Sequence, residues 1–206
     1  MGDVPGGPIS AKSYRSRREE RRRQEILLQA AYVLAEQGYH GVTLEAIASR
    51  LEMTKGSLYY YYPDKQQILY LVLKQGAQAA LDYINRQVGE MVSPTDKLGC
   101  WVDAHIRFIC QEMPFSVTLL QTDAILENVA YEEVQKLLAQ YNKVVDQILE
   151  NGINAGVFTV VPIRATRNFI LGALNWIPRW YTDQDEMTLT KLISVYRTHV
   201  LKLVGQ

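Results

Sequence analysis

The sequence predicts an all-α protein, and three observations support this fold class. Apolar residues recur three and four positions apart through most of the chain, which is the spacing of amphipathic helices. No segment alternates apolar and polar residues as a half-buried strand does. Start and stop signals separate the periodic segments: Ser93-Pro94 supplies a cap and a first-turn proline, while Gly38 and Gly156 follow two such segments. We therefore expect helices and no sheet.

The first expected helix spans residues 18–37 and ends at Gly38 in a left-handed conformation. Its inward face carries apolar residues at helical spacing: Ile26, Ala30, Val33 and Leu34. Residues 1–17, which precede this helix, are expected to form a disordered basic arm.

Charge is distributed unevenly, although the formal net charge of the chain is zero. Residues 1–23 carry seven basic and three acidic side chains, whereas residues 66–206 carry twelve basic and fourteen acidic ones. A basic segment that adjoins a DNA-binding domain can lie along DNA phosphates. We expect Arg18 and Arg22 to make such contacts. The alternative is a solvated tail, an interpretation that suits the Gly- and Pro-containing residues 1–13 best.

Two short helices joined by a tight turn are expected next, over residues 43–51 and 54–61. Thr43 and Thr54 can each cap the helix that follows, and Glu52-Met53 forms the turn. Only Leu58 in the second helix looks like a core residue. This pattern is typical of a helix-turn-helix whose second helix enters the major groove of DNA.

The second short helix carries residues suited to DNA. Lys55 can donate to guanine, and Ser57 can bond either base type. Gly56 allows close approach, while the tyrosines offer hydroxyls to phosphates and rings to thymine methyl groups. The alternative for Tyr59–Tyr62 is a core strand or a sticky patch. The predicted DNA-binding residues are Thr43, Thr54, Lys55, Gly56, Ser57, Tyr59, Tyr60, Tyr61, Lys65, Arg18 and Arg22.

The segment from about Ile26 to Leu73 resembles the DNA-binding domain of TetR-family regulators. The resemblance rests on Ala30-Ala31, Leu34, Gly38-Tyr39, Gly41-Val42-Thr43, Ile47-Ala48, Leu51, the run Lys55–Tyr61, Lys65 and Ile68-Leu69. Tyr62-Pro63 departs from the family pattern, where Phe is more usual at the first position. The resemblance implies an all-helical homodimer whose second domain binds a small effector and releases DNA. We accordingly expect a helix-turn-helix domain over residues 18–65 and an effector-binding and dimerisation domain over residues 66–206.

Six further helices are expected in the C-terminal domain, each from its apolar spacing and its caps. They span residues 64–88, 94–113, 115–126, 131–154, 162–177 and, from Asp183 or Asp185, to Leu203. The last two carry apolar residues on more than one face, together with Gly172-Ala173. One face can pack on the core and the other on a second copy, and the TetR resemblance implies a homodimer through these two helices.

Motifs for catalysis or metal binding do not occur in the sequence, so we expect neither an enzyme nor a cofactor. Cys100 and Cys110 fall about 15 Å apart on one expected helix, which fits free thiols in the cytoplasm. No apolar run is long enough to cross a membrane. A constitutive DNA-architecture protein is an alternative function, although it would not need so large a helical domain.

A cluster of polar and aromatic residues near one helix end predicts an effector site. The expected effector-binding residues are Trp101, His105, Asn175, Trp176, Arg179 and Trp180. The alternatives are an aromatic cap under a dimer bundle and, for His105, a hydrogen-bonded core histidine. The segment Leu171–Tyr181 resembles a TetR subgroup that answers to fatty acyl-CoA, which implies a repressor released by an acyl-CoA-type effector. A multidrug or other non-lipid effector is the alternative.

Overall fold

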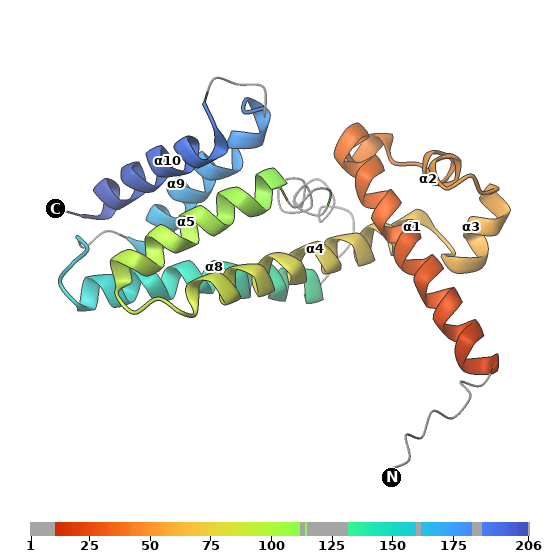
Figure 1. Ribbon diagram of the computed structural model, residues 1–206, viewed down its shortest axis with the longest axis horizontal. Coiled ribbons are helices and arrows are strands. Elements are labelled where there is room, and N and C mark those ends of the chain that lie inside the picture. Colours follow the sequence, from red (N-terminus) through yellow and green to blue (C-terminus); the bar gives the residue numbers. More distant parts are fainter. Residues whose placement is uncertain (1–10, 112–113, 115–131, 160–161, 183–186, 206) are drawn as a thin grey trace, which may run out of the picture. The chain divides into compact units, whose positions relative to one another are not determined.

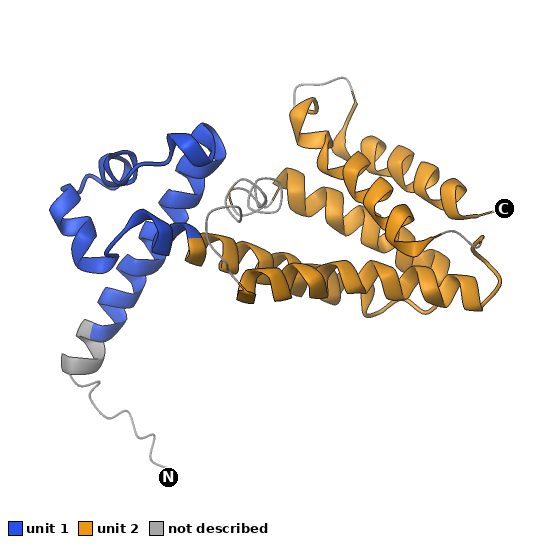
Figure 2. Ribbon diagram, turned by 180° about the vertical axis from the view of Figure 1, so that it is seen from behind, with its two compact units in different colours: residues 1–69 blue, residues 70–206 orange. Residues whose placement is uncertain are grey.

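The structure is a computed structural model of the 206-residue chain, and it describes residues 11–111, 114, 132–159, 162–182 and 187–205. Within these ranges the regular elements are all helical, which confirms the predicted all-α class. The chain forms two compact units, residues 1–69 and residues 70–206 (Figure 2). The division falls inside one helix rather than at the expected boundary after residue 65.

The first unit contains α1 (Ala11–Gly41), α2 (Leu44–Arg50), α3 (Lys55–Tyr61) and the start of α4 (Lys65–Val88) (Figure 1). Its core lies mainly on α1, α2 and the first turns of α4, with a single contribution from α3. The buried apolar residues are Ile26, Leu27, Ala30, Ala31, Val33, Leu34, Val42, Leu44, Ile47, Ala48, Leu51, Leu58, Tyr62, Ile68 and Leu69. These include all of the inward positions predicted for the first helix.

The first helix begins earlier than predicted, at Ala11 instead of Arg18. Residues 11–17 are therefore helical and do not form a disordered arm; residues 1–10 lie outside the described part. Basic charge alone suggests an arm, but residues 11–37 contain neither glycine nor proline and many good helix formers. Side-chain bonds at helical spacing, from Gln24 to Glu20 and from Arg22 to Glu25, add to the stability of this stretch.

Gly38 has a positive φ of 68°, as its predicted role requires, but its ψ of 176° is not left-handed helical. Glycine populates this region readily because it lacks a Cβ. Helical dihedrals are interrupted at Gly38, as predicted, and the chain then makes one further helical turn to Gly41, so that α1 consists of two helical segments joined by a kink.

The second unit contains the rest of α4 together with α5 (Pro94–Gln111), α8 (Glu132–Asn154), α9 (Ile163–Asn175), the 3₁₀ turn η1 (Ile177–Arg179) and α10 (Leu189–Val204). Helix α5 is central, since it packs against α8, α9, η1 and α10 (Figure 1). Its residues are buried along most of its length: Leu98, Gly99, Trp101, Val102, Ala104, His105, Ile106, Phe108 and Ile109. The second unit is thus built around one largely enclosed helix.

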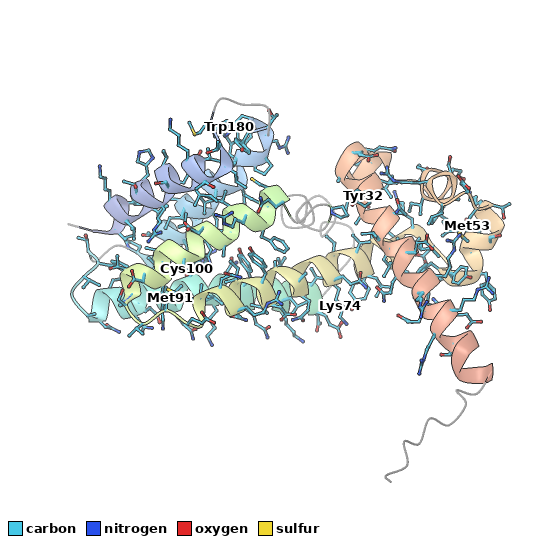
Figure 3. The ribbon with its side chains drawn as sticks, in the orientation of Figure 1. Tyr32, Met53, Lys74, Met91, Cys100 and Trp180 are labelled. Carbon is cyan, nitrogen blue, oxygen red and sulfur yellow. The ribbon has the colours of Figure 1, made fainter. Side chains whose placement is uncertain are left out.

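Helix α4 is joined to α8 by polar contacts as well as by the core. The hydroxyl of Tyr70 and the ammonium of Lys74 (labelled in Figure 3) both donate to the Glu133 carboxylate, at 2.5 and 2.6 Å. Asp64 caps the start of α4 by accepting from the Gln67 amide at 2.8 Å. The helix therefore begins within one residue of the predicted start.

Two C-terminal boundaries differ from the sequence prediction. The helix expected over residues 162–177 ends at Asn175 and continues as η1, because Pro178 disfavours α-helical geometry in the residue before it. The last helix begins at Leu189 with Thr188 as its cap, instead of at Asp183 or Asp185. The helix expected over residues 115–126 lies outside the described residues. Gly156, with a φ of 71°, follows the end of α8 as predicted.

Candidate DNA-binding and effector sites

The turn between α2 and α3 is held by short-range hydrogen bonds. Thr43 accepts from the Ala46 amide at 3.0 Å and Thr54 accepts from the Ser57 amide at 3.1 Å, as predicted for the two caps. The Met53 amide donates to the Ala48 carbonyl at 2.9 Å, and Glu52 takes a positive φ of 53°. Met53 is half-buried in this turn (Figure 3). Together these bonds set where α3 starts relative to α2.

Helix α3 exposes nearly all of its side chains. Leu58 is its one buried residue, whereas Tyr60 is 70% exposed and Tyr59 is 46% exposed. Tyr62, which follows the helix, is buried. The tyrosines therefore form neither a strand nor a uniform surface patch. A short helix with so little apolar burial is suited to contact another molecule through its outer face.

Gly56 is not required by the fold. Its backbone is helical, and a Cβ built there would meet only the Thr54 hydroxyl, at an ordinary contact distance of 3.9 Å. Glycine nevertheless costs roughly 1 kcal/mol relative to alanine inside a helix. The exposed glycine thus leaves room at the surface of α3 for a molecule that approaches closely.

Lys55 is paired within the protein through a hydrogen-bonded ion pair with Glu45 of α2. This contact lowers the pKa of Glu45 and raises that of Lys55. Both side chains are exposed, so water and salt screen the ion pair. Either group can therefore exchange its partner for another at little cost in free energy. The Ser57 hydroxyl lies 2.9 Å from that of Thr54, and Lys65 lies 5.1 Å over the Tyr39 ring.

A groove of about 650 Å³ runs between α1 and α3. It is lined by Arg18, Glu19, Arg21, Arg22, Glu25, Tyr60 and Tyr61. Arg18 is exposed, while Arg22 bonds to Glu25 at 2.5 Å. The structure thus brings the predicted arginines together with two of the predicted tyrosines.

Two arginines that sequence reasoning did not single out hold the elements of this unit together. Arg50 of α2 donates to Gln29 and Glu36 of α1, at 2.9 and 2.6 Å, and lies over the ring of Tyr32 (Figure 3). Arg23 of α1 donates to the backbone carbonyl of Tyr61 at 2.5 Å. Their partners are 14 to 38 residues away in the sequence, which is why local patterns did not reveal them.

In the second unit, three helices contribute to a buried polar cluster of Trp101, His105, Tyr141 and Asn175. The His105 ring bonds through Nδ1 to the Tyr141 hydroxyl at 2.6 Å and through Nε2 to Asn175 Oδ1 at 3.0 Å. The Trp101 ring stacks on His105 at 5.3 Å. Since the amide oxygen of Asn175 can only accept, Nε2–H donates to it and Nδ1 accepts from Tyr141.

The cluster is electrically neutral. Burial lowers the pKa of His105 to about 4 and raises the pKa of Tyr141, so both groups are uncharged near pH 7. The buried Trp101 Nε1–H has no hydrogen-bond partner among the described residues. The spacing of Tyr141 predicts a buried face, but its polar role was not predicted; a buried tyrosine hydroxyl that needs a partner was the available signal.

The other predicted effector residues lie apart from this cluster. Trp176 is 63% exposed, Trp180 is 44% exposed (labelled in Figure 3), and Arg179 is exposed at the end of η1. The structure therefore brings together Trp101, His105 and Asn175 and places the remaining three at the surface of the unit.

Helices α9 and α10 each present an exposed apolar face. On α9, Phe169 is 66% exposed and shares a face with Gly172, Ala173 and Trp176, which follow at helical spacing. On α10, Val195 and Leu203 are exposed eight residues apart. A Cβ at Gly172 would meet nothing within 4 Å. Within the described part of the chain, the side chains named on both helices are exposed.

Neither a membrane-spanning helix nor a metal site occurs among the residues that the structure describes. No helix there has the length and apolar character needed to cross a membrane. Within the same ranges, no group of three or more His, Cys, Asp or Glu side chains is arranged to hold a metal ion.

A capped, exposed helix-turn-helix followed by a separate helical unit defines a class of DNA-binding regulators. Sequence profiles identify the family: residues 26–70 match "Bacterial regulatory proteins, tetR family", and residues 91–204 match "Tetracyclin repressor-like, C-terminal domain". The second match alone covers more than half of the chain, and the chain belongs to the TetR family. It is therefore a DNA-binding transcriptional regulator and not an enzyme.

Individual relatives agree with this assignment. The fatty acid metabolism regulator protein of Bacillus subtilis (strain 168) is 22% identical over 171 residues, which cover 82% of this chain and 88% of that protein. The structure of PfmR from Thermus thermophilus is 26% identical with a TM-score of 0.72, covering 86% of this chain and 97% of that one. AibR in complex with isovaleryl coenzyme A and operator DNA is 19% identical with a TM-score of 0.78, covering 89% and 98%.

Proposed function

We propose that this regulator binds an operator as a homodimer and is a repressor released by a small apolar effector of the acyl-CoA type. The observation that carries the DNA-binding part is α3, which is capped at its start, exposed on nearly every side and held by one buried residue, Leu58. In this proposal Lys55, Ser57 and Tyr59 read base edges from the N-terminal part of α3. Gly56 admits the DNA backbone or a base edge where any side chain would stand in the way.

The remaining predicted contacts position the protein on the phosphates. Arg18 and Arg22 line a groove with Tyr60 and Tyr61, and this concentration of donors suits a backbone phosphate. Lys65, at the start of α4, is the further candidate. Glu19 and Glu25 in the same groove moderate its charge, so that the tyrosine hydroxyls would share the phosphate with the arginines.

A homodimer through α9 and α10 is supported by their exposed apolar faces. Large exposed side chains such as Phe169 and Trp176 gain by burial against a second copy, at about 25 cal/mol per Å² of apolar area. A Cβ at Gly172 would meet no described atom within 4 Å, so this position permits close approach of a helix from the second copy. Two reading helices would then contact two half-sites about one or more helical turns of DNA apart, which supplies the specificity that one helix lacks.

The effector part rests on the neutral polar cluster within the apolar core of the second unit. The Trp101 indole N–H is a buried donor without a partner among the described residues, and Asn175 and Tyr141 lie on either side of His105. An uncharged acceptor such as a thioester carbonyl suits this cluster, whereas a carboxylate would meet no cation among the described residues that form it. Exposed Arg179 and Trp180 are the candidates for an anionic head outside the core.

Relatives favour the same effector class. AibR was solved with isovaleryl coenzyme A and operator DNA, and the Bacillus subtilis relative regulates fatty acid metabolism. The test is an operator obtained by selection from random duplexes and then titrated with acyl-CoAs of increasing chain length. Release that strengthens with chain length supports the proposal, because each buried methylene contributes about 0.8 kcal/mol. Tight binding that no acyl-CoA weakens removes the acyl-CoA effector and leaves a non-lipid effector or a constitutive DNA-binding protein.

A further inference from the structure

Arg23 lies in the basic stretch of α1, yet its contacts are directed into the protein. Its guanidinium donates from Nη1 to the carbonyl oxygen of Tyr61 at 2.5 Å. Tyr61 is the last residue of α3. The final carbonyls of a helix have no partner within the helix, and a cation beside them also meets the negative end of the helix dipole. Arg23 therefore caps the C-terminal end of α3 from a different helix.

A second set of contacts fastens the same two segments. The guanidinium carbon of Arg23 lies 5.8 Å from the ring centre of Tyr61 and 5.4 Å from that of Tyr62. In return, the Tyr62 hydroxyl donates to the backbone carbonyl of Arg23 at 3.3 Å. Tyr62 is buried and Arg23 is half-buried, so this reciprocal arrangement is partly shielded from water.

Among the described residues, these contacts act together with the burial of the Tyr62 ring to hold the end of α3. Leu58 is the only buried residue of the helix, and the Thr54 cap and the turn to α2 hold only its N-terminal end. Tyr60 and Tyr61, at the free end, line the groove that also contains Arg18 and Arg22. The position of the Tyr61 backbone therefore sets the orientation of the Tyr60 and Tyr61 side chains in this groove.

We propose that Arg23 is a positioning residue for operator recognition: it fixes the C-terminal end of α3 against α1 and does not itself neutralise a phosphate. Its neighbours differ in this respect, since Arg18 is exposed and lines the groove. Arg23 acts through Tyr61 and Tyr62, on the geometry of the surface that meets DNA. The inference rests on the proposed reading role of α3.

Salt dependence separates the two roles, because each phosphate neutralised contributes about 0.9 to the slope of log affinity against log salt for duplex DNA. The experiment compares Arg23→Ala with Arg18→Ala, which removes the same charge from the same helix, on the selected operator and on a random duplex. Arg23→Ala is expected to lower operator affinity about tenfold while leaving random-duplex affinity and the slope unchanged. Arg18→Ala is expected to weaken both duplexes and to reduce the slope by about 0.9.

Two further variants keep the net charge of the protein and alter only the contacts between Arg23 and the end of α3. Tyr62→Phe removes only the hydroxyl bond to Arg23 and is expected to lower operator affinity severalfold at an unchanged slope. Arg23→Lys keeps the charge but loses the planar group that lies over two rings, and it is expected to bind the operator like Arg23→Ala. Wild-type operator binding by Arg23→Lys, or a slope for Arg23→Ala that falls as much as that of Arg18→Ala, would overturn the proposal.

Amide hydrogen exchange of the DNA-free protein supplies a readout that does not involve DNA. The Tyr62 amide donates to the Leu58 carbonyl at the end of α3, and its exchange is expected to quicken in Arg23→Ala but not in Arg18→Ala. Unchanged exchange of the Tyr62 amide in Arg23→Ala would contradict the proposal that Arg23 fixes the end of α3. If α3 is not the reading helix, Lys55→Ala will leave sequence preference unaltered while the exchange difference remains, so the two failures are distinguishable.

Discussion

Lys55 is proposed to contact DNA, yet in the free protein its ammonium already has a partner within the chain. In the free protein its ammonium is bonded to Glu45 of α2, and both groups are exposed. Such a pair is screened by water and salt, so an acceptor on a base edge can replace the carboxylate at little cost. Glu45 therefore orients Lys55 at the start of α3, and the pair is weak enough for Lys55 to exchange Glu45 for an acceptor on DNA.

Loss of Lys55 should relax sequence preference at one position of each half-site. Lys55→Ala is expected to reduce discrimination there roughly tenfold, because a base-edge contact carries sequence information that a phosphate contact does not. Glu45→Gln is the matched control, since it weakens the ion pair and leaves the lysine in place. Selection on duplexes randomised at the half-sites measures both variants. Identical preferences in Lys55→Ala and the wild type would contradict a base-edge contact by Lys55 and count against α3 as the reading helix.

His105 links the polar cluster to a measurable pH effect. Its pKa falls from 6.5 to about 4 in the folded chain, because burial disfavours the imidazolium. Below pH 6.5 the unfolded chain therefore binds a proton that the folded chain refuses. The stabilising effect of a neutral His105 is complete above pH 6.5 and is lost progressively as the pH falls toward 4.

The free energy of unfolding should accordingly fall with acid more steeply in the wild type than in His105→Gln. Between pH 7 and pH 5 the extra loss is expected to be about 2 kcal/mol, from 1.36 kcal/mol per pKa unit. Urea unfolding at the two pH values measures it, and the variant cancels the contribution of the carboxylates. Equal losses in both proteins would show that His105 is accessible to protons in the folded state.

At the scale of helices, contacts between residues close in the sequence were predictable, whereas contacts between residues far apart in the sequence were not. Thr43 and Thr54 are identifiable as caps because each bonds an amide only three residues away. The predicted start of α1 is wrong because basic charge, and not helix propensity, determined it. The Arg23–Tyr61 bond spans 38 residues, and nothing in the local pattern distinguishes Arg23 from the arginines beside it. The polar cluster was predictable in part, since the sequence singles out Trp101, His105 and Asn175 but not Tyr141.

The exposed faces of α9 and α10 give the prediction that belongs to this scale. If the chain forms the proposed dimer through α9, Gly172→Glu is expected to give a folded monomer. A side chain at Gly172 meets no described atom of its own chain within 4 Å, but in the proposed interface it would place a charge between closely packed helices. Gly172→Ala, the matched control, adds only a methyl group and should weaken the dimer less. Light scattering measures the mass and circular dichroism the helix content. A dimeric Gly172→Glu protein would exclude α9 from the interface.

For the whole molecule, release from DNA requires an effector with different affinities for two states of the protein. An effector that binds both states equally shifts nothing, however tightly it binds. The helix α4 begins in the first unit and continues in the second, so it connects the unit that contains α3, the proposed reading helix, to the unit that contains the polar cluster. If binding beside His105 favours a state whose α3 no longer fits the operator, operator binding must disfavour the effector by the same factor.

This reciprocity gives a prediction that does not depend on how the units move. The affinity of an acyl-CoA is to be measured by calorimetry with the free protein and with protein saturated by operator, and operator affinity with and without saturating acyl-CoA. The two ratios are expected to be equal and to lie between about 5 and 150, the usual range of coupling between sites. Trp101→Phe removes the indole N–H, which has no partner among the described residues, and should weaken acyl-CoA binding to both forms, which leaves the ratio largely intact. A ratio of one would mean that acyl-CoA binds without regulating DNA, because linkage allows no release without a matching loss of effector affinity on the operator.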